Sequence, residues 1–168
     1  MKRTALLIAL VLFIYATPVM AQDEMEEVSP SRAGYLSLGI TGGLMVDPDM
    51  GAGMISADYY ITEEISVGPY FQAGGGKHDS YWGMSGQVKV SAALATNTKA
   101  KPYGHIGIGF VQLDFEERDD DPEYTYLFPV GGGMEFEMTD MISLDFGGTF
   151  NITEDPFAGL MVGMRIVL

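Results

Sequence analysis

Apolar and polar side chains alternate along one stretch of the chain, Ile142-Ser143-Leu144-Asp145-Phe146-Gly147-Gly148-Thr149-Phe150-Asn151-Ile152. Successive side chains of a β-strand point to opposite faces, so this alternation predicts a strand with one apolar face and one face of small or polar groups. The last residues of the chain repeat the pattern, with apolar side chains at every second position from 160 to 168 and Arg165 on the opposite face. Both segments therefore predict strands that separate two unlike environments.

The alternation recurs along residues 34–168 between clusters of Gly, Pro, Asp and Asn, and it predicts further strands. The full set of expected strands is 34–46, 52–62, 65–76, 81–94, 101–115, 123–138, 142–151 and 157–168. Within 101–115 the apolar residues change face after Phe110, which predicts a β-bulge at that position. No stretch has the period of an amphipathic helix, so the predicted fold class is all-β, an eight-stranded antiparallel up-and-down barrel.

The first residues have the organisation of an export signal. Lys2 and Arg3 precede an unbroken apolar run at 5–16, and small residues at 18–21 then offer a cleavage point. The run is shorter than the roughly 20 residues that span a bilayer, so the pattern predicts a cleaved secretory signal peptide. The expected organisation is a signal peptide at 1–21, a polar N-terminal tail at 22–33 and a barrel at 34–168.

The composition excludes several function classes. The chain has 168 residues with 22 glycines, no cysteine and a formal net charge of −14. Without cysteine there is no disulfide, thiolate zinc site or cysteine nucleophile. Binding to nucleic-acid phosphates needs clustered Lys and Arg, which this acidic chain lacks, so no nucleic-acid partner is expected.

Two kinds of barrel fit the pattern, and they differ in what the apolar face touches. A soluble, lipocalin-like barrel would turn this face inward, whereas a membrane barrel would turn it outward to lipid. The opposite face is mainly Gly, Ser and Thr, which suits a narrow lumen better than a solvated exterior. Aromatic residues are concentrated toward the strand ends, as membrane–water interfaces favour: Tyr59, Tyr60, Tyr103 and Phe136 near one rim, and Tyr81, Trp82, Phe115, Tyr124 and Phe157 near the other. The membrane barrel is favoured, and a secreted or periplasmic barrel that binds an apolar ligand is the alternative.

Two segments carry a family resemblance. Gly131-Gly132-Gly133 begins a Gly-rich strand that leads through the Thr139-Asp140 turn into an alternating strand, and Tyr103-Gly104-His105 looks like a recurrent hairpin start. Over residues 34–168 the chain thus resembles the small outer-membrane barrels of the OmpA/OmpX type, the porin-family barrel domain. The resemblance implies a bacterial outer-membrane location, contact with outer-membrane lipid and lipopolysaccharide, handling by the barrel-assembly machinery, and a monomer. The assembly signal would be Met164, Ile166 and Leu168, although the family usually ends in Phe or Trp.

The resemblance also implies periplasmic termini, three periplasmic turns and four outward loops. A tight turn at 139–141 would put Glu135 opposite Asp145, and Arg165 would lie near Asp145 if strand 157–168 ends level with the start of strand 142–151. Asp58 and Lys89 have a similar depth from their periplasmic ends. These five residues predict an ionic layer in the periplasmic half of the lumen. Two interpretations remain: a structural plug that sets the register, or a gated ion path.

The outward connections are acidic. Their acidic residues include Asp47, Asp49, Asp79, Glu116, Glu117, Asp119, Asp120 and Asp121. Such a rim suits divalent cations or a basic partner, and the alternative is an ordinary solvated surface. Asp119-Asp120-Asp121 lacks the spaced ligands and the glycine of an EF-hand loop, and no cofactor is expected.

Catalysis is the weaker interpretation. His78, Asp79 and Ser80 are adjacent, and neighbours on an extended loop cannot form the mutual hydrogen bonds of a nucleophile, base and orienting acid. The expected function is therefore a non-enzymatic outer-membrane barrel with a structural, envelope-integrity or surface-interaction role and no open pore. A narrow ion-conducting barrel and a lipid A-modifying enzyme are the remaining alternatives.

Overall fold

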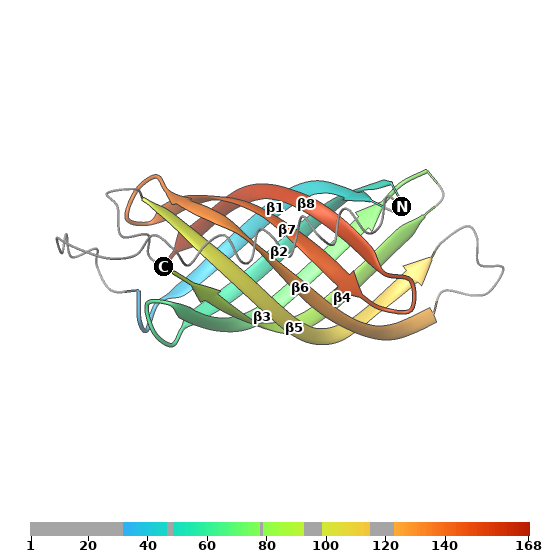
Figure 1. Ribbon diagram of the computed structural model, residues 1–168, viewed down its shortest axis with the longest axis horizontal. Coiled ribbons are helices and arrows are strands. Elements are labelled where there is room, and N and C mark those ends of the chain that lie inside the picture. The colour runs from blue at the N-terminus through green and yellow to red at the C-terminus, as the bar shows by residue number, and fades with distance from the viewer. Residues whose placement is uncertain (1–31, 47–48, 78, 93–98, 115–122) are drawn as a thin grey trace.

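Eight antiparallel strands close into a barrel in which chain neighbours pair and the first strand pairs with the last (Figure 1). The structure is a computed structural model and describes residues 32–46, 49–77, 79–92, 99–114 and 123–168. The strands are β1 (Leu36–Val46), β2 (Met50–Tyr60), β3 (Ile65–Gly75), β4 (Ser80–Ser91), β5 (Ala100–Asp114), β6 (Glu123–Glu137), β7 (Ile142–Ile152) and β8 (Phe157–Val167). The up-and-down barrel fold is confirmed, and the predicted strand ends lie within about three residues of those observed. The described residues contain no helix long and apolar enough to cross a membrane.

Two short turns define one end of the barrel. In each, a threonine hydroxyl accepts backbone N–H groups just beyond a strand: Thr62 from Ile65 at 3.0 Å, and Thr139 from Ile142 at 3.0 Å. The start of β1 and the end of β8 lie at this same end, which we call the turn end. The opposite end, where β1 meets β2 and β5 meets β6, is the loop end. The turn after β6 places Glu135 directly opposite Asp145, as the sequence predicts.

The predicted bulge at Phe110 is wrong. The register between β4 and β5 runs without a slip from the Ser80–Asp114 pair to the Ser91–Tyr103 pair. Val111 and Leu113 are instead fully buried in the lumen, and Phe110 faces outward like the alternate residues before it. The apparent change of face arises because the lumen itself is apolar at this height, so both faces of β5 carry apolar side chains there.

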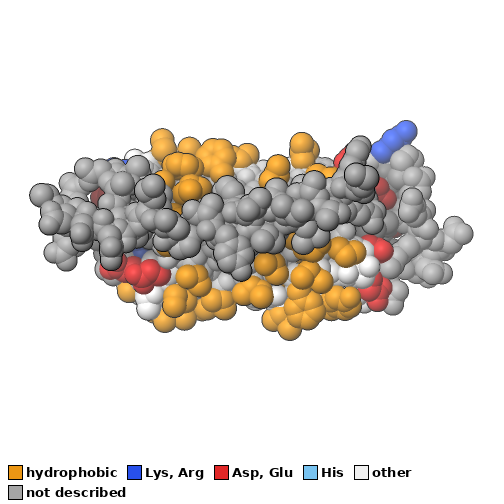
Figure 2. All heavy atoms as spheres, viewed as in Figure 1, with side chains coloured by type: hydrophobic (Ala, Val, Ile, Leu, Met, Phe, Trp, Pro, Cys, Tyr) orange, Lys and Arg blue, Asp and Glu red, His pale blue; other side chains and the backbone are white. Residues whose placement is uncertain are grey.

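The exterior of the barrel is apolar. Ile40, Ile108 and Leu160 are 61%, 65% and 73% exposed, and orange side chains predominate on the coloured part of the flank, between red groups near the two ends (Figure 2). The charged strand side chains that the structure describes face the lumen, except Asp114 at the loop end of β5. A charge-free outer band and a charged interior are the reverse of a soluble barrel.

The predicted aromatic rims are correct only in part. Tyr60, Tyr81 and Phe157 point into the lumen and are at most 3% exposed, and Tyr103 also faces inward. The outward aromatic cluster at the loop end consists of Phe71, Trp82, Phe110 and Tyr124. Adjacent residues such as Tyr59 and Tyr60 must point to opposite sides of a strand, so position near a rim does not decide which surface a ring joins.

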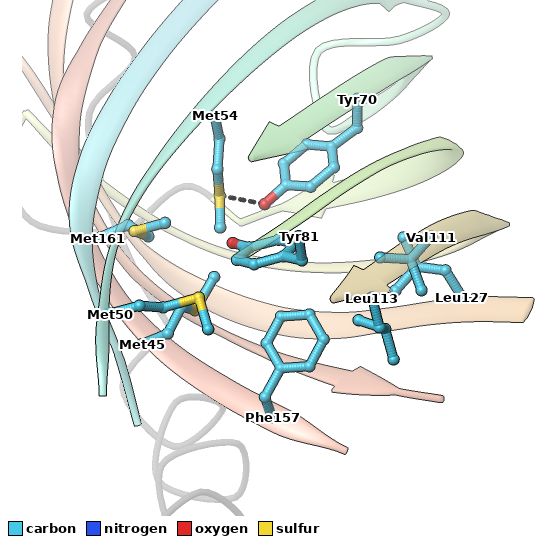
Figure 3. Packing of buried hydrophobic residues seen from close by; sticks show 10 residues of the cluster. All are labelled: Met45, Met50, Met54, Tyr70, Tyr81, Val111, Leu113, Leu127, Phe157 and Met161. Carbon is cyan, nitrogen blue, oxygen red and sulfur yellow. Dashed lines mark hydrogen bonds between the residues drawn. The ribbon is translucent and has the colours of Figure 1, made fainter. Parts of the chain in front are cut away.

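An apolar cluster fills the loop-end half of the lumen, a feature that the sequence did not predict. We call it the apolar plug; Figure 3 shows its members, Met45, Met50, Met54, Tyr70, Tyr81, Val111, Leu113, Leu127, Phe157 and Met161. The rings of Tyr81 and Phe157 lie 4.8 Å apart at its centre. Large side chains from strands around the barrel thus meet across the lumen and close it by packing.

Candidate functional site: a charged layer that closes the lumen

Six charged side chains gather in the turn-end half of the lumen. This charged layer consists of Arg32, Asp58, Lys89, Glu135, Asp145 and Arg165. The structure brings the five residues singled out from the sequence into one connected group and adds Arg32. Three cations face three carboxylates, so the layer is neutral in total, which lowers the cost of burying each charge.

Arg165 on β8 connects one side of the layer. Its guanidinium forms an ion pair with Asp58 and lies 3.6 Å from carboxylate oxygens of both Glu135 and Asp145. It also donates a hydrogen bond to the Ser37 hydroxyl at 3.1 Å. Gly39 lies beside this guanidinium, and a Cβ there would come within 2.6 Å of the Ser56 hydroxyl, so the glycine leaves room for Ser56 next to Arg165.

Glu135 on β6 connects the other side. Its carboxylate accepts from Arg32 at 2.6 Å, from Lys89 at 3.0 Å and from the Ser143 hydroxyl at 2.8 Å. Hydrogen bonds to a charged acceptor are the strong ones, and here they come from β4, β7 and the segment before β1. Glu135 therefore ties distant parts of the barrel to one buried carboxylate.

Arg32 closes the turn end and was missed by the sequence analysis, which placed it in a polar tail. Tyr35 N–H donates to the Arg32 carbonyl at 3.0 Å and closes a tight turn. Gly34 in this turn has a φ of 86°, a backbone conformation that glycine adopts more readily than other residues. This turn directs the Arg32 side chain to Glu135 and, at 2.7 Å, to Glu137, with its guanidinium 5.7 Å from the Tyr60 ring centre. Burial by itself lowers the pKa of the Arg32 guanidinium, but the attraction and hydrogen bond to Glu135, together with Tyr60 and Glu137, outweigh this and raise the pKa, so the group stays charged.

Neutral groups satisfy the remaining acceptors of the layer. The Tyr103 hydroxyl donates to Asp145 at 2.5 Å, and the Gln87 side-chain amide donates to Asp58 at 3.1 Å. The Lys89 ammonium lies 4.1 Å from the centre of the Tyr103 ring. A network in which each of the six charges has a partner of opposite sign is rigid.

Little space remains between the charged layer and the apolar plug. A cavity of about 40 Å³ lies there, with Ser56, Tyr103, His105 and Thr149 among its lining residues. This volume accommodates a few water molecules and no sugar-sized solute. Across the lumen, the Gln72 side-chain amide donates to the Asn151 side-chain oxygen, Oδ1, at 3.0 Å. Apart from this cavity, the described lumen is closed by packed side chains at both ends.

The other predicted residues lie apart from the charged layer. Asp49 and Asp79 lie at the loop end, whereas Asp47, Glu116, Glu117, Asp119, Asp120 and Asp121 lie outside the described residues. His78 also lies outside them, so the His78-Asp79-Ser80 trio has no described geometry. Within the described ranges, no group of three or more His, Asp or Glu side chains is arranged to hold a metal ion. Met164, Ile166 and Leu168 face outward, and Leu168 N–H donates to the Leu36 carbonyl at 2.8 Å where the barrel closes.

Comparisons with known proteins show the fold. No protein-family model matches the chain, and no curated protein matches its sequence. Among solved structures, the N-terminal β-barrel domain of OprF from Pseudomonas aeruginosa has a TM-score of 0.65 at 12% identity, covering 81% of this chain and 98% of that one. Neisserial surface protein A gives 0.61 at 13%, covering 79% and 95%, and Ail of Yersinia pestis gives 0.52 at 12%, covering 80% and 97%. The chain has the fold of the small eight-stranded outer-membrane β-barrels.

Proposed function

We propose that the protein is an integral barrel of a bacterial outer membrane that seals its own lumen and acts through its structure or its outer surface. The observation that carries this proposal is the distribution of charge. The described charged strand side chains face the lumen except Asp114, while large apolar side chains cover the exterior. In water this arrangement would expose an apolar belt around the whole barrel. In a bilayer the same belt contacts the hydrocarbon chains of the lipid.

The height of the apolar belt supports the same proposal. β1, β2, β3, β7 and β8 have 11 residues each. A strand of this length rises about 36 Å along its own axis and, at a tilt of about 40°, spans roughly 28 Å. The outward apolar band of outer-membrane barrels is about 25 Å tall, so these strands are long enough to cross it.

The alternative of a soluble carrier for an apolar ligand fits the lumen poorly. Such a carrier needs a large apolar cavity, whereas this lumen contains buried ion pairs, the apolar plug and a cavity of about 40 Å³. Membrane fractionation and heat-modifiable gel mobility would test the assignment. We expect the folded chain in the outer-membrane fraction, with a shift in mobility on boiling; a soluble protein without this shift would refute the proposal.

The packed lumen also favours a closed barrel over a porin-like channel. The charged layer and the apolar plug both lie across the route that a solute would take, and opening either would leave buried charges or rings without partners. In planar-bilayer recordings we expect no stable, sugar-permeable conductance. Steady large openings that pass sugars would contradict the proposed closure.

The loop end provides the outer surface through which the protein would act. Its described acidic residues include Asp49, Asp114 and Glu154, while Lys77 is the described cation there. One structure of Ail contains the heparin analogue sucrose octasulfate. An acidic rim repels such a polyanion, so we propose basic partners for this chain, with divalent cations as bridges to lipopolysaccharide phosphates. In a surface pull-down, a polycationic probe should retain more of the protein than a polyanionic probe of similar length.

Export and assembly complete the proposal. We propose that the signal peptide at 1–21 is cleaved, that Met164, Ile166 and Leu168 form the signal read by the barrel-assembly machinery, and that the barrel is a monomer. We also propose that it has no enzymatic activity, because the described His105 faces Tyr70 and Tyr103 rather than a serine nucleophile. Unchanged lipid A acylation on expression, measured by mass spectrometry, is the expected result.

A further inference from the structure

The methionines of the barrel are divided between its two surfaces. Those that the structure describes as outward or at a turn are Met84, Met134, Met138, Met141 and Met164. The described inward methionines are Met45, Met50, Met54 and Met161, and they come from three neighbouring strands, β8, β1 and β2. Figure 3 shows these four side chains together along one wall of the apolar plug, with aromatic and aliphatic groups opposite.

The strand register brings three of these side chains onto adjacent positions. Met45 and Met50 are direct cross-strand partners on β1 and β2. Met161 on β8 is paired with Gly43, two residues before Met45, so its side chain is the diagonal neighbour of Met45. Directly opposite side chains in a sheet are about 5 Å apart and diagonal ones about 7–8 Å, within reach of long flexible side chains. Met54 is next along the wall, with its sulfur accepting a hydrogen bond from the Tyr70 hydroxyl.

Two glycines shape the wall on which these thioethers lie. A Cβ at Gly43 would overlap the Leu160 carbonyl and lie 2.5 Å from the Met161 sulfur, and a Cβ at Gly159 would overlap the Met45 sulfur. Both glycines thus leave space for a sulfur atom against the backbone of the β1–β8 pair. The Met45 and Met161 thioethers thus lie against glycines of the sheet on one side and within the apolar plug on the other.

The chemistry of these groups is selective. A thioether is a soft, neutral donor, which favours soft monovalent ions such as Cu(I) over Mg²⁺, Ca²⁺ or Zn²⁺. The chain contains no cysteine, so its sulfur donors are methionines alone. Met45 and Met50 occupy the inward positions of β1 and β2 nearest the loop end, where Asp49, Asp114 and Glu154 make the mouth acidic. An acidic mouth raises the local concentration of cations at the route to the sulfurs.

We propose that Met45, Met50 and Met161 form a binding site for a soft monovalent cation, Cu(I) or Ag(I), in the loop-end half of the lumen, between its mouth and the central cavity. The three thioethers supply the ligands, and the flexible methionine side chains adjust by rotation to bring their sulfurs onto one ion. Met54 is held by Tyr70 and completes the sulfur-rich wall. The site lies on the opposite side of the central cavity from the charged layer and does not require any of its ion pairs to open.

Titration of the refolded full chain in detergent with Ag(I), followed calorimetrically, tests the proposal. We expect one saturable equivalent per chain, and no comparable binding of Ca²⁺ or Mg²⁺ by the same groups. In the triple variant Met45→Leu, Met50→Leu and Met161→Leu the volume is nearly conserved but the sulfurs are lost, so Ag(I) affinity should fall at least a hundredfold. A matched triple variant with Met84, Met134 and Met164 changed to leucine should bind like the wild type.

A second measurement covers the case in which the first triple variant fails to fold. In the wild-type chain with ¹³C-labelled methionine methyl groups, Ag(I) should shift the signals of Met45, Met50 and Met161 and leave those of the outward methionines in place. Absence of saturable binding, equal binding by the two triple variants, or shifts confined to outward methionines would each overturn the proposal. Those results would assign the inward methionines to packing alone.

Discussion

Replacing Arg165 with methionine removes the cation that three lumen carboxylates share. Asp58 would keep only the hydrogen bond from Gln87, while Asp145 would keep the Tyr103 hydroxyl, and Glu135 would keep Arg32 and Lys89. The cost therefore falls mainly on Asp58, which is completely buried. Breaking a buried pair by removal of one partner typically costs 3–5 kcal/mol, and we expect the free energy of unfolding to fall by about 4 kcal/mol.

The assay is equilibrium unfolding in urea of the barrel inserted in lipid vesicles. The chain has one tryptophan, and Trp82 lies on the outward aromatic cluster at the loop end, so its emission reports the loss of the lipid-inserted fold. Gel mobility without boiling provides an independent measure of the folded fraction. Lys101→Met is the matched control, because Glu137 keeps its ion pair with Arg32 at 2.7 Å when Lys101 is lost, and we expect a loss of about 1 kcal/mol.

A double-mutant cycle separates the ion pair from general effects of the substitution. Adding Asp58→Asn to Arg165→Met removes the uncompensated charge, so the double variant should recover about 2 kcal/mol relative to the single variant. The reasoning would be refuted by an Arg165→Met barrel as stable as the wild type, or by a cycle in which the two substitutions simply add. Either result would mean that the carboxylates of the charged layer do not depend on Arg165.

Three further substitutions test other parts of the barrel. Arg32→Gln should lower the free energy of unfolding by about 1–2 kcal/mol in the same urea assay, which is less than for Arg165→Met. Glu135 keeps its ion pair with Lys89, and Arg32 is more exposed than Arg165. An equal or larger loss would contradict this ranking. Gly109→Ala should destabilise the barrel by at least ~2 kcal/mol, because a Cβ there meets the backbone of β4. Gly86→Ala is the control and should be nearly neutral, because no atom lies within 4 Å of a Cβ at that position. Similar stabilities of the two variants would refute the close approach of β5 to β4 at Gly109. Tyr103→Phe removes the hydroxyl that donates to Asp145 and should cost about 1–3 kcal/mol, measured by the urea midpoint and judged against an outward Tyr126→Phe control.

The arrangement of the strands could be predicted because each strand borders two environments. Alternation along Ile142–Ile152 indicates a strand whose faces differ, and the Thr-Asp turn sets the Glu135–Asp145 register without reference to the rest of the molecule. Period, turn chemistry and length are local properties. They were sufficient for the order of the strands and for the direction in which most side chains point.

The contents of the lumen depend on contacts between residues far apart in the chain. Arg32 lies 103 residues before Glu135 in the chain. It precedes the first strand, in a turn that contains Gly34, so no alternation of side chains indicates that it points inward. The apolar residues Val111 and Leu113 suggested a bulge because the prediction from alternation takes the inward face to be polar. In the barrel, the inward face of β5 contacts the apolar plug at that height, and the register is continuous. Likewise, Tyr60 and Phe157 lie near strand ends, but only the closed barrel decides that their rings point inward.

The sequence by itself determined an eight-stranded barrel with an apolar face and a polar face, because side-chain alternation and tight turns act over a few residues. Tertiary structure alone decided that the barrel is closed twice, by a neutral charged layer at the turn end and by a methionine-rich apolar plug at the loop end. The physical reason is that a lumen is formed by all eight strands at once. Which charges pair, and which apolar groups meet, depends on the curvature and register that bring opposite walls together.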